Sequence, residues 1–259
     1  MVEKEIGFYR SCKRVIVLAF IITLSLGAYA KAMADDRSEA QSMVDKAKGT
    51  IVDLTNDSMF LWLNSHLKEA KGVLIFPQII KGGFFLGGSG GTGILVTRDE
   101  STGAWSYPAF YTLGSVTFGL QIGGEAAEVV MVAMSQKAIN TLLSSSVKLG
   151  GDVSIAVGPL GGGAKGSVGV PEVTTDIVSF SRTKGLYGGL NLEGSLLVVR
   201  TGLNEVYYGA GTLPIDIVIA KKVVNPGADE LRAALEKITG KRTIPPGPPE
   251  QLSPPETAK

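Results

Sequence analysis

The sequence has few of the residues that most enzymes use for nucleophilic or metal chemistry. Its 259 residues include one cysteine, Cys12, and one histidine, His66. Cys12 lies in a segment that we expect to be removed, so the remaining chain has no disulfide, thiol nucleophile or thiolate metal site. A single histidine also excludes multi-histidine metal centres and Cys–His catalysis. The sequence therefore predicts no metal, no cofactor and no enzymatic activity.

Long apolar runs are also scarce, and the one that stands out is at the N-terminus. Basic residues between positions 4 and 14 precede the apolar run 15–26, and Ala32-Met-Ala34 follows as an A-x-A cleavage site. A run of twelve residues, ten of them apolar, suits a signal peptide, whereas a membrane-spanning helix needs roughly 20. The pattern predicts a signal peptide at residues 1–34 and a protein that is exported, periplasmic or peripherally membrane-associated. An uncleaved N-terminal anchor remains the alternative.

The sequence also lacks a large excess of positive or negative charge. Residues 35–259 contain 20 basic and 22 acidic side chains, a net charge of about −2. Such a balance gives no basic field for nucleic acid. No polar linker interrupts residues 35–240, which indicates a single domain. Six of the twelve prolines fall in residues 245–259, so 241–259 is predicted to be a disordered proline-rich tail.

The hydrophobic pattern predicts helices at both ends of a β-rich region. Apolar residues recur at spacings of three and four along the helix expected at 36–54: Ala40, Met43, Val44, Ala47, Ile51 and Leu54. Further helices are expected at 57–70, 135–143 and 225–240. Short strands fill the rest: from Val73 onward, and at 116–122, 128–133, 153–157, 177–181, 187–192 and 196–200. The fold class is α+β: a curled or barrel-like antiparallel β-sheet with N-terminal helices, one inserted helix and a C-terminal helix.

Glycine is abundant between the first strands, where seven of residues 82–93 are glycine. Gly88 to Gly93 spells G-x-G-x-x-G, a dinucleotide fingerprint, but strand-like Ile94-Leu-Val-Thr follows where the fingerprint needs a helix. The glycines at 161–163 are no P-loop either, because Gly166 separates Lys165 from Ser167. We therefore expect the protein to bind no nucleotide. The glycines should instead let strands turn, bulge or approach closely.

The remaining candidate catalytic or cation-binding residues also fit ordinary structural roles. His66 is expected to be a surface or hydrogen-bonded side chain, and Glu125 and Glu128 fit a turn and a strand start as well as acid–base or cation-binding work. A hydrolase acting through His66 or a carboxylate is the weakest of the functions considered. The aromatic cluster at 105–111 is expected in the core, with a binding platform as the alternative.

Several motifs occur in the order that is typical of one family. They are AKGVLIFP at 70–77, the glycine-rich stretch 81–93, WSYPAF at 105–110, Gln-Ile-Gly at 121–123, Gly158-Pro159 and Tyr207-Tyr-Gly209. Over residues 36–222 the chain resembles the SYLF domain family, also called the actin-binding domain of yeast endocytic adaptors. It departs from the eukaryotic members, which often carry an SH3 or FYVE module, and it begins with an export signal.

The resemblance implies a membrane-binding protein, because members bind phosphoinositides through an N-terminal amphipathic helix with basic residues. It implies anionic-lipid binding through Lys46, Lys48, Lys68, Lys71 and Lys81. The apolar stripe of the first helix would either pack on the sheet or insert into the headgroup layer through Met43 and Ile51. The function expected is therefore non-enzymatic binding of anionic phospholipid or phosphoinositide-like headgroups in the bacterial envelope.

A second hypothesis is an envelope scaffolding module that binds a protein or wall polymer, with the proline-rich tail as spacer or ligand. Actin binding would follow only by distant family analogy, since an exported protein would not meet actin.

Overall fold

The computed structural model describes residues 35–83, 86–118, 123–160, 175–183, 186–187 and 192–240. The signal peptide, the proline-rich tail, the glycines at 161–163 and most of the strand expected at 187–192 lie outside these residues. So does part of the strand expected at 116–122 and of the Gln-Ile-Gly motif.

Short helical segments follow a long N-terminal helix. Residues 35–56 are helical, as the apolar spacing predicts. Next come η1 (Ser58–Phe60), α2 (Leu61–His66) and η2 (Leu67–Glu69), so the helix expected at 57–70 is present but broken into tighter turns. The Asp57 carboxylate caps η1 by accepting from the backbone N–H of Met59.

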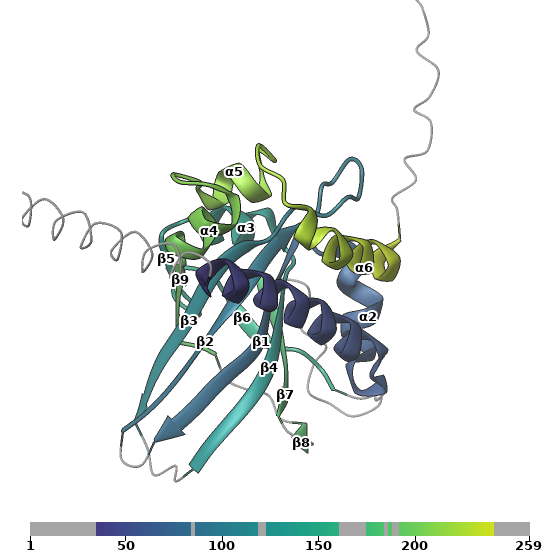
Figure 1. Cartoon of the computed structure of the whole chain (residues 1–259). Coiled ribbons are helices and arrows are strands. Elements are labelled where there is room, and N and C mark those ends of the chain that lie inside the picture. Colours follow the sequence, from purple (N-terminus) through teal and green to yellow (C-terminus); the bar gives the residue numbers. More distant parts are fainter. Residues whose placement is uncertain are drawn as a thin grey trace, which may run out of the picture.

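A curled sheet forms the centre of the described molecule (Figure 1). Its order is β5-β9-β3-β2-β1-β4-β7-β6, with β8 paired to β7. The strands are β1 (Gly72–Gly83), β2 (Leu86–Thr97), β3 (Ala109–Phe118), β4 (Gly123–Ala133), β5 (Ser146–Lys148), β6 (Ile155–Val157), β7 (Ile177–Thr183), β8 (Leu186–Tyr187) and β9 (Leu196–Val199). All described pairs are antiparallel except β6 with β7, which is parallel. The α+β class and the curled sheet are thus confirmed, with one parallel pair that the pattern did not predict.

The glycines of β2 accommodate a bulge in β1. The register of β1 shifts between Phe76 and Ile79 against β4, and between Ile75 and Ile80 against β2. A Cβ on Gly93 would lie 2.5 Å from the Ile75 carbonyl oxygen and from the Phe76 ring, and a Cβ on Gly91 would overlap the Gln78 carbonyl. These glycines permit close approach inside a sheet, as predicted, and no helix follows them.

Two apolar layers cover the two faces of the sheet. On the first face pack the N-terminal helix, α2, α4 (Thr201–Tyr208) and α6 (Asp229–Thr239), around Trp105 and Phe110. On the second pack α3 (Gln136–Leu142) and α5 (Pro214–Val218), around Tyr111. The core position expected for the aromatic cluster is confirmed, with Trp105, Phe110 and Tyr111 all buried.

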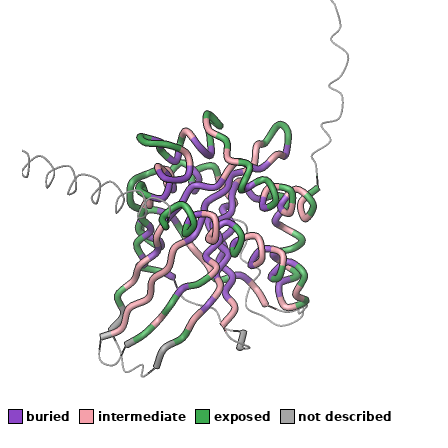
Figure 2. Tube along the Cα trace, in the orientation of Figure 1, coloured by how far each residue is buried: buried purple, intermediate pink, exposed green. Residues whose placement is uncertain are grey.

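Four strands extend beyond the helices. The ends of β1, β2, β3 and β4 farthest from α3 and α5 project from the body, and their tubes are largely intermediate or exposed in Figure 2. This four-stranded extension contains the glycine-rich part of β2 and carries the exposed side chains of Ile80 and Val116. Amphipathic sheets normally bury one face, so the extension is the unusual part of the architecture.

Two of the later helices were predicted and two were missed. Ser135 caps α3 by accepting from Ala138, and Gly240 ends α6 with a positive φ of 71°, both as expected. Neither α4 nor α5 was predicted. A further turn, η3 (Pro226–Ala228), precedes α6, and the Asn225 side chain caps it.

Candidate functional site

One side of the N-terminal helix borders the extension. Glu39, Lys46 and Asp53 are spaced by seven residues, so they lie on the same side of the helix. The contacts of Glu39 and Asp53 place this side against the sheet margins, because Glu39 pairs with Arg200 after β9 and Asp53 with Arg182 of β7. Lys46 lies midway between these two ion pairs.

At one end of this border, Arg182 is held by several acceptors. Its guanidinium lies 2.5 Å from Glu128, 3.7 Å from Asp53 and 4.0 Å from Asp57, and Thr50 donates to the second Glu128 oxygen at 3.1 Å. Burial opposes the charge of Arg182, but the hydrogen bond and charge of Glu128 outweigh it, so the pKa of the guanidinium is raised. Arg182 is therefore a structural clamp between helix and sheet, with its charge already compensated.

At the other end, Arg200 is compensated in the same way. Its guanidinium lies 2.9 Å from Glu39 and donates to the Thr92 hydroxyl of β2. The two arginines thus fasten the helix to opposite sides of the sheet, and each guanidinium is paired with at least one carboxylate.

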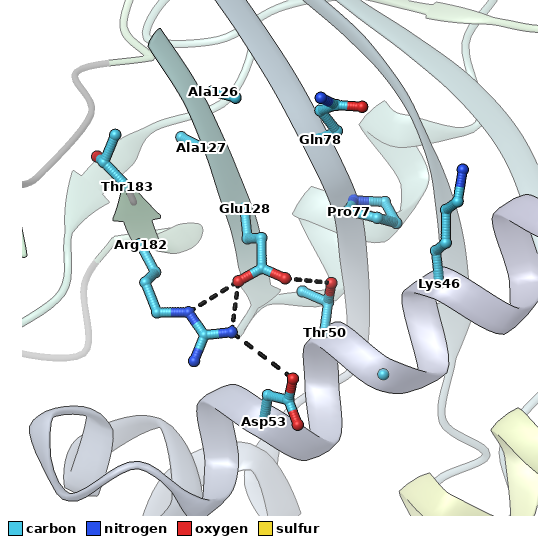
Figure 3. A pocket seen from close by; sticks show the side chains of 11 residues that line it. Lys46, Thr50, Asp53, Pro77, Gln78, Ala126, Ala127, Glu128, Arg182 and Thr183 are labelled. Carbon is cyan, nitrogen blue, oxygen red and sulfur yellow. Dashed lines mark hydrogen bonds and ion pairs between the residues drawn. The ribbon is translucent and has the colours of Figure 1, made fainter. Parts of the chain in front are cut away.

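A cavity of about 390 Å³ lies under this border, within the range of roughly 300–1,000 Å³ typical of small-ligand sites. The helix lines it with Lys46, Gly49, Thr50 and Asp53, and the sheet with Pro77, Gln78, Ala126, Ala127, Glu128, Arg182 and Thr183. Figure 3 shows Arg182, Glu128 and Asp53 turned toward one another, while Lys46 points away from them. Lys46 is exposed, and within the described part of the chain it makes no ion pair.

The sheet surface beyond the cavity carries no charge. Directly paired residues share a face, and one row runs across five strands as Leu196, Gly114, Gly90, Ile80 and Ala126. A second row contains Val116, Gly88 and Gly82. We call these eight residues, with Val198, the apolar face. Ile80 is 59% exposed and Val116 69% exposed.

The opposite face of the same strands is polar. Lys81 of β1 pairs in register with Ser89 of β2 and Glu125 of β4. The Ser89 and Ser115 hydroxyls are hydrogen-bonded at 2.7 Å. The extension is therefore an amphipathic sheet whose apolar side adjoins the Lys46 cavity.

The structure does not bring the five predicted lysines together. Lys48 pairs with Glu230 of α6 at 2.5 Å, which raises the pKa of Lys48, and Lys71 pairs with Glu100 at 2.5 Å. Lys68 is exposed beyond α2, and Lys81 lies on the polar face of the extension. Of the predicted set, Lys46 alone lines the cavity.

The two predicted membrane-inserting residues belong to the packed side of the helix. Ile51 is fully buried in the first core, and Met43 is half-buried against it. Packing of the apolar stripe on the sheet, the first of the two alternatives, is the arrangement in this structure. Ile51 could reach lipid only if the helix left the sheet, which would expose the core residues Val44, Ala47 and Leu54 as well.

The remaining sequence candidates have structural partners. The His66 ring stacks on Trp62 with centroids 4.1 Å apart, and its Nδ1 lies 2.9 Å from the Trp62 carbonyl oxygen and from the Ser65 hydroxyl. Glu128 serves the Arg182 clamp, and Glu125 lies on the polar face. Within the described ranges we find no cluster of metal ligands and no helix long and apolar enough to cross a membrane.

Sequence reasoning missed Arg182 and the apolar face. Arg182 gives no local signal, because its partners are 54 to 129 residues away in sequence. The apolar face had a usable signal in β3, where Gly114 and Val116 alternate with the polar residues Ser115 and Thr117, but its exposure depends on where the helices end.

Fold and site together define an α+β domain with an amphipathic sheet extension beside a cavity that Lys46 lines. Residues 114–238 match the family model Ysc84, described as Las17-binding protein actin regulator. The chain is 32% identical over 172 residues to Protein YSC84 of Saccharomyces cerevisiae, covering 66% of this chain and 36% of that protein. It is 37% identical over 166 residues to an SH3 domain-containing protein of Schizosaccharomyces pombe, covering 63% and 38%.

A human protein is similar to this chain over a comparable length. SH3 domain-containing YSC84-like protein 1 is 30% identical over 176 residues, which cover 68% of this chain and 51% of the human protein. The chain thus spans between about a third and a half of the length of these relatives. It carries a domain of the Ysc84, or SYLF, family and belongs to that family. The family is one of actin regulators and adaptors.

Proposed function

We propose that the chain is a non-enzymatic module that binds anionic phospholipid at a membrane surface of the bacterial envelope. The observation that carries the proposal is Lys46, an exposed cation without an ion pair in the described residues, between two compensated arginines. It stands at the edge of a cavity and beside an uncharged sheet face. A lipid phosphate would form an ion pair with Lys46, and a membrane would cover the apolar face.

The magnitude of such binding is modest. A basic residue near an anionic surface contributes about 1 kcal/mol, screened over a Debye length of about 8 Å at physiological salt. The half-exposed valine, leucine and isoleucine side chains of the apolar face add burial energy at about 25 cal/mol per Å². Binding should therefore be weak to moderate and only partly sensitive to salt.

Flotation of residues 35–259, the chain that remains after the predicted cleavage, with liposomes tests this function. We expect more protein to float with phosphatidylglycerol-containing liposomes than with phosphatidylcholine liposomes, and we expect salt to reduce the difference. Equal recovery with both liposomes at every salt concentration would exclude an electrostatic contribution. Recovery with neither would exclude membrane binding altogether.

A second candidate function is binding of a protein partner, because the matching family is described as Las17-binding. For this chain we propose the envelope counterpart, a scaffold that binds protein or wall polymer through the proline-rich residues 241–259. Removing residues 244–259 should then abolish capture of the partner and leave liposome flotation unchanged. Loss of flotation with the same truncation would contradict a separate role for the tail.

The signal peptide predicted at residues 1–34 supports a periplasmic or membrane-associated location. Its cleavage would be shown by an N-terminus at Asp35 in protein recovered from the periplasm. An intact N-terminus in the membrane fraction would support the uncleaved anchor instead.

A further inference from the structure

We propose that the apolar face holds one acyl chain of an anionic phospholipid, with the phosphate of that lipid at Lys46. This inference rests on the proposed function and goes further, because it makes the extension a binding site for a single lipid molecule.

The first argument is the shape of the face. The row from Leu196 to Ala126 crosses five neighbouring strands, or about 19 Å at ~4.8 Å per strand. An acyl chain that fills half of a bilayer is about 15 Å long, since the hydrocarbon core is ~30 Å thick. The two residues in the middle of the row, Gly114 and Gly90, carry no side chain between Leu196 and Ile80.

The second argument is the continuity of the row with the cavity. Ala126 both ends the row and lines the cavity, together with Lys46. An amphiphile lying along the row therefore brings its polar end to the cavity that Lys46 also lines. Of the charged groups that line the cavity, Glu128 and Asp53 are both paired with Arg182. Lys46 makes no ion pair in the described residues and is therefore the cation that can bind an anion.

The third argument is the contrast with the other face. The other face is hydrophilic, because it carries Lys81, Ser89, Ser115 and Glu125. A sheet with one polar and one apolar face normally packs its apolar face against another structure. A second copy of the chain would also cover it, but a symmetric pair would leave both Lys46 side chains without an anion.

Native mass spectrometry of residues 35–259, the chain that remains after the predicted cleavage, tests the proposal with a myristoyl lysophosphatidylglycerol below its micellar concentration. Glycerol 3-phosphate at equal concentration serves as the headgroup-only probe. We expect a one-to-one adduct with the lysolipid and none with glycerol 3-phosphate.

Two adjacent residues of β3 give a matched pair of variants. Val116→Glu puts a carboxylate on the apolar face, and Ser115→Glu puts one on the polar face. We expect V116E to weaken lysolipid binding by about tenfold or more, the effect of ~1.4 kcal/mol, and S115E by less than about twofold. Gly114→Glu repeats the test in the centre of the row, where a Cβ would meet nothing within 4 Å, and circular dichroism verifies the fold of each variant.

The outcomes separate this proposal from the function on which it rests. Equal lysolipid binding by V116E, G114E and S115E would overturn the acyl-chain site, while flotation with anionic liposomes would still uphold membrane binding. Failure of flotation with a lysolipid adduct present would overturn the membrane function and leave the acyl site standing. A dimer that V116E dissociates, with no adduct in the wild type, would show that a second copy covers the face and would overturn the proposal.

Discussion

At the scale of single residues, the glycines of β2 and β3 have different physical roles. A Cβ on Gly93 would collide with Ile75 and Phe76, whereas a Cβ on Gly114 would meet nothing within 4 Å. We expect Gly93→Ala to destabilise the fold by about 1–3 kcal/mol, the usual cost of overpacking, and Gly114→Ala to be neutral or slightly stabilising. Urea unfolding measures both. Equal effects would contradict the claim that the β1 bulge requires glycine opposite it.

Asp176 gives a second prediction for a single residue. Its carboxylate accepts from Ser135 at 2.6 Å, Ser154 at 2.8 Å and Lys137 at 3.0 Å. The hydrogen bond from Ser135, with those from Ser154 and Lys137, lowers the pKa of Asp176 despite its burial. It therefore joins the start of α3 to β7.

A lowered pKa in the folded state stabilises the protein at pH values above the unfolded pKa of about 3.9. That contribution is lost as the pH falls below it toward the pKa of the folded protein. We expect Asp176→Asn to cost about 1–3 kcal/mol at pH 7, with a difference from the wild type that shrinks below about pH 4. Urea unfolding at several pH values measures this, with exposed Asp36→Asn as the control. A difference independent of pH would contradict the assignment.

At the scale of secondary-structure elements, Arg182 and Arg200 fasten the N-terminal helix at both margins of the sheet. Replacing Arg182 leaves half-buried Glu128 without its cation, so Arg182→Ala should destabilise the fold by about 1–3 kcal/mol. It should also speed hydrogen exchange in residues 40–54. The exposed lysine variant Lys237→Ala is the control. Unchanged exchange would show that apolar packing alone holds the helix.

A helix or strand can be predicted from the sequence when its own residues carry the hydrophobic pattern and caps of that element. The helices at 36–54, 135–143 and 225–240 have periodic apolar residues and caps, so they could be predicted from the sequence alone. Helix α4 contains Gly202 and two tyrosines and is poor in helix formers. Its stability comes from tertiary contacts: Leu203 and Tyr207 are buried, and the Asn204 side chain accepts from the Phe110 N–H at 2.8 Å. No local pattern records such contacts.

The candidate site was foreseen in part for the same reason. Lys46 was among the predicted lysines because it lies on the amphipathic helix. Its distinction from Lys48 depends on Glu230, which is 182 residues away. The apolar stripe of the helix was visible in sequence, but only the sheet beneath it shows that the stripe is already occupied.

At the scale of the whole molecule, the domain separates a covered body from an uncovered extension (Figure 2). Both apolar sides of the helix-covered body are packed, so membrane binding need not disturb the core. We therefore expect anionic liposomes to leave hydrogen exchange in residues 40–54 unchanged and to slow it in residues 86–92 and 112–118. Faster exchange in 40–54 would indicate that the helix leaves the sheet and inserts.

The most direct measurement is flotation of Lys46→Glu with phosphatidylglycerol-containing liposomes at low salt, beside Lys237→Glu. Both variants change the net charge equally, and both side chains are exposed. If Lys46 is the cation that meets the membrane, Lys46→Glu should lose most of the flotation that Lys237→Glu retains. Equal flotation of the two variants would contradict the account.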